Sequence, residues 1–116
     1  MRSIEIRLRD ILEACEVIRG FIEEVESLEY FESSPLYQSA VIYQLIIIGE
    51  AVVHIDDEFK LRHRQIPWDN LKRFRNFAAH QYFGIDWIEV WNMCERILSD
   101  IEQRMTEVLS KEFPDF

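Results

Sequence analysis

A regular spacing of apolar residues restricts this chain to a helical fold. From Ile4 to Leu28, apolar side chains recur every three or four residues, which places them on one face of an α-helix. The chain has only three glycines and three prolines among 116 residues, which is fewer than the turns of an all-β fold require. The sequence therefore predicts an all-α protein whose first helix runs from about residue 3 to residue 30.

A second helix is predicted from residue 35 to about residue 64. Ser34 before Pro35 is a capping hydroxyl followed by a proline at the first helical position. The helix is apolar on nearly all sides, so other helices are expected to surround it. Gly49 inside it costs about 1 kcal/mol relative to alanine and predicts a close helix crossing. Glu50 follows, and because an unpaired carboxylate there would be costly, it is expected to meet a cation or a helix end.

Two more helices complete the predicted fold. The third is expected over residues 67–82, with Gly84 as a left-handed cap. The fourth is expected over residues 86–111, where Asp86 and Glu89 have the spacing of a capping box. Four helices with short connections predict an antiparallel four-helix bundle, with room for short extra helical turns. A chain of this length is expected to form one domain over residues 1–116.

The charges of the chain are unevenly distributed. The net charge is −9, yet residues 60–80 hold six cations and one anion, which leaves −14 on the rest. An acidic protein repels a phosphate backbone at long range, whereas this basic segment would attract one. Uneven charge also occurs on surfaces without a function. If the segment does bind RNA, the cations expected to contact it are Arg64, Lys72 and Arg73.

The basic segment ends in the sequence Arg-Asn-Phe-Ala-Ala-His-Gln-Tyr at residues 75–82. Arg75 keeps its charge and can bind a phosphate through two parallel hydrogen bonds. Histidine is the side chain best suited to moving protons near neutral pH, so His80 is a candidate for proton transfer. Tyr82 offers a hydroxyl group and an aromatic face on which a base can stack. These groups suit cleavage of a phosphodiester bond in RNA, although each of them alone also occurs as an ordinary surface or core residue.

This segment resembles the R-x4-H-x-Y motif of the HEPN-domain ribonucleases. Residues on both sides make the chain similar to the HepT-like toxins within that superfamily, and the likeness extends over about residues 36–105. The flanking residues that carry it are Gly49-Glu50-Ala51, Pro67-Trp68, Asp86 and Trp91.

The resemblance implies a metal-independent endoribonuclease that needs no cofactor. Attack of the ribose 2′-hydroxyl on phosphorus would leave a 2′,3′-cyclic phosphate, with Arg75 and His80 as catalytic residues and Asn76 and Tyr82 in support. The family resemblance further implies the toxin of a type VII-like HepT/MntA toxin–antitoxin pair. Its partner, a minimal nucleotidyltransferase antitoxin, would transfer AMP to Tyr82. The alternative is a non-catalytic protein that binds nucleotide or docks to a nucleotidyltransferase.

A homodimer is expected for two reasons. The fifteen aromatic residues exceed what so small a bundle usually hides. On one continuous helix, His80 would also lie about 140° round from Arg75. Either that helix ends before His80, or a second chain completes the site across a two-fold axis, as the resemblance to HEPN nucleases implies. A higher assembly with the antitoxin is compatible with either arrangement.

The remaining titratable residues suggest no further site. Cys15 and Cys94 occupy apolar positions of helical patterns and are expected to be reduced core residues. The histidines lack the spacing of zinc ligands, so no metal is assigned. The N-terminus has no apolar leader, and the longest uninterrupted apolar run, residues 45–48, is too short to span a membrane. We therefore expect a cytoplasmic protein without a membrane partner.

Overall fold

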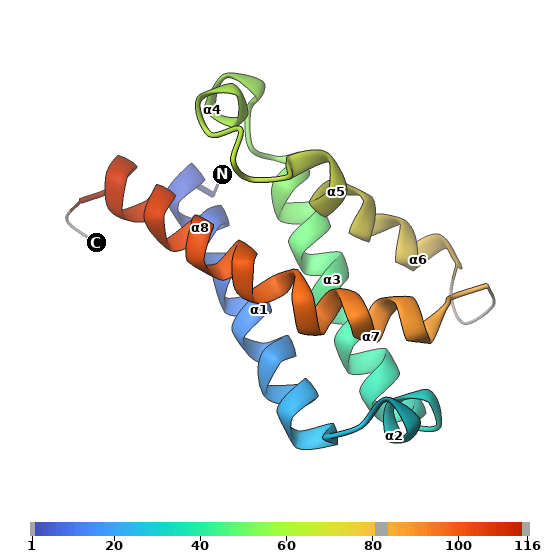
Figure 1. Cartoon of the computed structure of the whole chain (residues 1–116). Helices are drawn as coiled ribbons and strands as arrows, with labels where there is room; N and C mark the ends of the chain where they lie inside the picture. Colours follow the sequence, from blue (N-terminus) through green and yellow to red (C-terminus); the bar gives the residue numbers. More distant parts are fainter. Residues whose placement is uncertain (1, 81–83, 115–116) are drawn as a thin grey trace.

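A computed structural model of the chain describes residues 2–80 and 84–114, and every regular element in these ranges is helical (Figure 1). The prediction of an all-α fold is thereby confirmed. The elements are α1 (Ile4–Val25), α2 (Leu28–Glu32), α3 (Pro35–Val53), α4 (Asp57–Arg62), α5 (Trp68–Lys72), the 3-10 turn η1 (Arg73–Asn76), α6 (Phe77–His80), α7 (Trp87–Arg96) and α8 (Leu98–Glu112).

Four helical segments form the bundle, with α3 at its centre. One side of α3 packs against α1, and α5, η1 and α6 follow it along another side. The segment made of α7 and α8, orange to red in Figure 1, runs across α1. Side chains that are fully buried between these segments include Leu8, Ile18, Leu45, Leu71 and Ile101. The predicted helical bundle is therefore present, and its third segment carries the sequence motif.

The first two predicted helices are each shorter than expected. Helix α1 ends at Val25 because Glu26 adopts a left-handed conformation with φ 70°, and the hydroxyl of Ser27 then caps α2. Apolar spacing continues through this break, so periodicity alone could not reveal it. Helix α3 ends at Val53 rather than near residue 64. A carboxylate oxygen of Asp56 accepts a hydrogen bond from the backbone N–H of Phe59 at 2.8 Å and starts α4 instead.

The third and fourth predicted helices are also interrupted. The segment from Trp68 to His80 changes from α-helix to a 3-10 turn at Arg73–Asn76 and back again. A 3-10 turn is wound more tightly than an α-helix, so the 140° offset between Arg75 and His80 does not apply. The last helix is interrupted at Ile97, which is 44% exposed although its position in the apolar pattern predicts burial.

Several local signals in the sequence are confirmed. The hydroxyl of Ser34 accepts a hydrogen bond from the N–H of Tyr37, and Pro35 is the first residue of α3. The carboxylate of Asp86 accepts hydrogen bonds from the N–H groups of Ile88 and Glu89 at 3.1 and 3.2 Å. Gly84 has φ 82°, the left-handed conformation expected of it. Each of these signals depends on residues within a few positions along the chain, so tertiary packing does not override it.

The two cysteines are free and buried, as predicted. Burial is the main cause that raises the pKa of the Cys15 and Cys94 thiols to about 12. Both side chains therefore stay protonated at neutral pH and pack as small apolar groups.

Helix α3 is long and apolar enough to span a membrane by length and composition alone, a test that central core helices also pass. In the structure, Val41, Leu45 and Val52 are buried in the bundle. Other helices do not surround α3 completely, however, because Leu36 is 74% and Tyr43 is 64% exposed. The expectation of a fully enclosed helix is therefore wrong, since the short segments α5 and α6 leave one apolar face of α3 open.

Candidate functional site

The position of Arg75 is set by its contact with α3. A Cβ atom added to Gly49 would lie 2.5 Å from the backbone nitrogen of Arg75 and 3.1 Å from its Cα. Real Cβ atoms do not come so close to backbone, so only glycine allows η1 to approach α3 at this point. The predicted close helix crossing at Gly49 is confirmed, and it holds the backbone of the motif arginine against the central helix.

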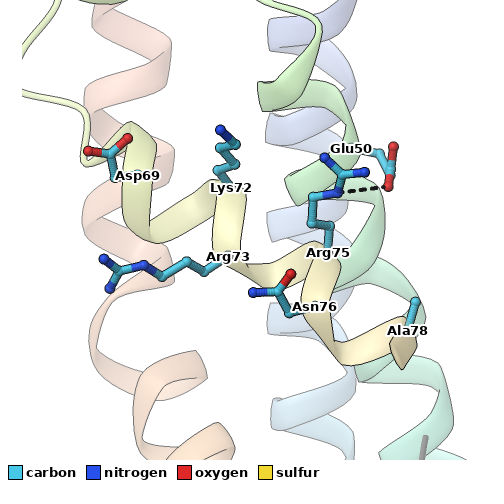
Figure 2. Close-up of a pocket in the computed structure, with 7 residues that line it drawn as sticks. All are labelled: Glu50, Asp69, Lys72, Arg73, Arg75, Asn76 and Ala78. Atoms are coloured by element: carbon cyan, nitrogen blue, oxygen red, sulfur yellow. Dashed lines mark ion pairs between the residues drawn. The ribbon is translucent and has the colours of Figure 1, made fainter. Parts of the chain in front are cut away.

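Glu50, the next residue of α3, holds the Arg75 side chain. Its Oε1 lies 3.4 Å from Nε of Arg75, an ion pair marked by the dashed line in Figure 2. The Glu50 and Arg75 side chains are 49% and 43% exposed, so solvent screens the pair and its contribution to stability is small. The expectation that Glu50 meets a cation is confirmed. Two adjacent residues of α3 thus contact Arg75: Gly49 packs against its backbone, and Glu50 pairs with its side chain.

A pocket of about 610 Å³ opens beside this ion pair. In Figure 2, Lys72 and Arg73 extend from the same segment as Arg75, and Asn76 lies next to Arg75 on η1. Neither Lys72 nor Arg73 forms an ion pair with a described residue, so their charges are available to a ligand. We call this site the Arg75 pocket. Its lining residues are Glu50, Asp69, Lys72, Arg73, Arg75, Asn76 and Ala78.

The structure therefore brings together four of the predicted site residues. Arg75, Asn76, Lys72 and Arg73 line one pocket, whereas Arg64 lines a neighbouring one. The sequence did not indicate that Asp69 belongs to the site. The signal was weak, because a single aspartate in the first turn of a helix is common for reasons of capping and the helix dipole.

Two predicted site residues cannot be placed in the pocket. His80 is the last residue of α6, and its side chain lies outside the described residues. Tyr82 lies wholly outside them. Their roles in proton transfer and AMPylation, and the orienting role of Asn76 toward His80, stay predictions.

The titratable side chains of the described residues include one buried histidine paired with a carboxylate. Within residues 2–80 and 84–114, no three His, Cys, Asp or Glu side chains are grouped as metal ligands would be. His63 is buried and its Nε2 lies 2.8 Å from Oε2 of Glu112, which joins the end of α4 to the end of α8. Hydrogen bonds from His63 and then Arg62 lower the pKa of the Glu112 carboxyl.

Comparisons with known proteins point in the same direction as the motif. The profile of the family described as Ribonuclease HepT-like matches residues 11–108. The chain is 36% identical over 107 residues to a Thermococcus cleftensis protein named "Probable ribonuclease HepT", covering 92% of this chain and 96% of the relative. It is 34% identical over 114 residues to "Putative RNase TTE0752" of Caldanaerobacter subterraneus, covering 97% and 99% of the two chains. No solved structure matches the chain.

Proposed function

The chain belongs to the ribonuclease HepT-like family, and we propose that it is a metal-independent endoribonuclease toxin, neutralised by a minimal nucleotidyltransferase antitoxin. The observation that carries the proposal is the Arg75 pocket. Three cations line it, and α3 contacts one of them, Arg75, through Gly49 at its backbone and Glu50 at its side chain. Such a fixed positive site suits a phosphate in a reaction that develops negative charge on oxygen.

The proposed reaction is an internal transfer at phosphorus. The 2′-hydroxyl attacks the adjacent phosphorus and loses its proton, the bond to the 5′-oxygen breaks, and that oxygen receives a proton. A 2′,3′-cyclic phosphate and a free 5′-hydroxyl result. His80 is proposed to transfer a proton in this step, a role worth about 10²–10⁴-fold in rate. Arg75 binds the non-bridging oxygens, while Lys72 and Arg73 hold the neighbouring backbone.

A homodimer is part of the proposal because the open face of α3 adjoins the Arg75 pocket. The motif segment consists of α5, η1 and α6. An apolar pocket of about 250 Å³ lies between α3 and this segment, lined in part by Ile42, Tyr43 and Phe77. Ala78 lines both this pocket and the Arg75 pocket. A second copy packed on the open face would therefore bring its own motif segment close to Arg75, which supports a composite site.

AMPylation of Tyr82 is the proposed means of neutralisation. The tyrosine oxygen would attack the α-phosphorus of ATP, release pyrophosphate and keep an adenylyl group. Tyr82 follows the last residue of α6 by two positions, so the added phosphate would lie near the motif segment. Its negative charge would compete with RNA for the cations of the Arg75 pocket and repel the substrate backbone.

The test is cleavage of single-stranded RNA by purified protein in the presence of EDTA. We expect products with cyclic phosphate ends, and a kcat lower by about 10²-fold or more for Arg75→Ala. The matched control is Arg96→Ala, which removes an exposed cation of α7 that lines neither the Arg75 pocket nor the apolar pocket. Activity that chelation abolishes and Mg²⁺ restores would refute metal independence. RNA binding without any cleavage would favour the non-catalytic alternative.

A further inference from the structure

A second pocket of about 530 Å³ lies between α4 and the start of α5. Asp69 lines both this pocket and the Arg75 pocket, so the two adjoin along the same edge of the bundle. Lys60 and Arg64 line the new pocket from α4 and the turn after it. We call it the α4–α5 pocket.

Most cations of these two pockets form no ion pair with a described residue, unlike most of the other cations in the chain. Among the described residues, six of the thirteen lysines and arginines form ion pairs, and five of the six line neither pocket. Of the seven that form none with a described residue, four line the two pockets: Lys60, Arg64, Lys72 and Arg73. A cation without a carboxylate partner attracts a phosphate more strongly than a paired one. The edge of the bundle at α4, α5 and η1 therefore holds four cations that have no carboxylate partner among the described residues.

The α4–α5 pocket also contains groups that a phosphate alone would not need. Leu61 is 62% exposed, and it lines the pocket together with Pro67, so the pocket offers apolar surface on which a base can stack. The carboxylates of Asp57 and Asp69 also line the pocket. A carboxylate repels a phosphate but accepts a hydrogen bond from an amino group of a base. The cations therefore suit the phosphate of a nucleotide, the apolar surface suits the face of its base, and the carboxylates suit the amino groups on the edge of that base.

We propose that the α4–α5 pocket binds a nucleotide that flanks the scissile phosphate on the same RNA strand. The strand then runs from Arg75 past Asp69 to Arg64 and Lys60. Single-stranded RNA is the occupant that fits, because its splayed bases leave both the phosphate and the base edge open to protein groups. This inference rests on the proposed function for the identity of the substrate. It adds a binding subsite outside the cleavage motif.

The experiment compares the double variant Lys60→Ala/Arg64→Ala with the control Arg96→Ala/Lys111→Ala. Both variants lose two exposed or partly exposed cations that form no ion pair with a described residue, but the control residues on α7 and α8 line neither pocket. Cleavage is measured on an RNA of about ten nucleotides and on a dinucleoside monophosphate, whose only phosphate is the scissile one. Affinity is measured separately with a 2′-O-methyl RNA of the same sequence, which binds without being cleaved. Circular dichroism verifies that both variants are folded.

We expect the Lys60→Ala/Arg64→Ala variant to raise KM for the longer RNA about tenfold, with kcat unchanged, because it removes binding outside the reacting bonds. Cleavage of the dinucleoside monophosphate should not change. The dependence of 2′-O-methyl RNA affinity on salt should weaken by about 0.7 in logarithmic slope, since the pocket binds one phosphate and each neutralised phosphate on a single strand contributes about 0.7. The control variant should resemble the wild type in all of these measurements.

The binding measurement separates this inference from the proposed function. If the wild-type protein fails to cleave RNA, the proposed function is wrong, yet the affinities of the two variants still decide on the subsite. Equal affinity of the wild type and the Lys60→Ala/Arg64→Ala variant for 2′-O-methyl RNA would overturn the inference. So would a variant that keeps its RNA affinity and loses binding to a nucleotidyltransferase partner, because the pocket would then belong to a protein interface.

Discussion

Replacing Gly49 by alanine tests the close contact that positions Arg75. The chain provides its own control, because Gly20 also lies inside a helix and an added Cβ there would meet nothing within 4 Å. Both substitutions gain the same helix propensity, about 0.5–1 kcal/mol. Only Gly49→Ala introduces a collision, with the backbone nitrogen of Arg75 at 2.5 Å.

The size of the effect follows from that distance. Ordinary contact begins at 3.4 Å, so η1 must move away from α3 by about 0.9 Å, and a backbone atom cannot avoid the collision by changing a rotamer. Overpacking of this kind costs about 1–3 kcal/mol, which exceeds the gain in propensity. Gly20→Ala should raise Tm by about 2–4 °C, whereas Gly49→Ala should lower it, and the two variants should differ by about 8 °C.

The same displacement should reduce activity. A catalytic group misplaced by about 1 Å can cost about 10²-fold in rate, so kcat/KM of Gly49→Ala should fall by about that factor. Thermal unfolding followed by circular dichroism and steady-state RNA cleavage measure the two effects. If Gly49→Ala were as stable and as active as Gly20→Ala, the close approach of Arg75 to α3 would be wrong, and with it the argument that α3 positions the site.

Three further outcomes are expected. Arg75→Ala should lower kcat by about 10²-fold or more and change Tm by less than about 2 °C, since the side chain is half-exposed; a large loss of Tm in thermal unfolding would instead indicate a structural role. Mixing Arg75→Ala chains with His80→Ala chains should restore part of the RNA cleavage, because one site of the heterodimer would be intact; a protein that sediments as a fully active monomer would contradict this. Burial is the main cause that raises the pKa of Glu102, and one of its carboxylate oxygens is buried without a partner among the described residues. The ionised form is therefore disfavoured in the folded state, so the stability advantage of Glu102→Gln over the wild type should grow as pH rises through the raised pKa. Urea unfolding at a series of pH values should show the two proteins converging at the acidic end.

Features of this protein that depend on near neighbours along the chain could be predicted from its sequence alone. Apolar spacing identified the helices because residues three and four apart share a face, whatever the rest of the molecule does. Ser34 and Asp86 marked helix starts because their side chains bind backbone N–H groups two or three residues away. The motif at residues 75–82 identified the family because the residue types and their spacing are themselves the signal.

Features that depend on residues far apart in the chain became visible only in the folded protein. Gly49 predicted a close crossing, but only the packing of η1 on α3 showed that Arg75 is what it meets and that Glu50 holds the arginine side chain. The break at Glu26 and the exposure of Ile97 were also invisible to periodicity, because an apolar residue fits the pattern whether or not another helix covers it. The open face of α3 and the division of the basic segment into two pockets also depend on how segments far apart in the chain pack together. Local spacing fixes which face of a helix is apolar, whereas the path of the whole chain fixes which faces are covered.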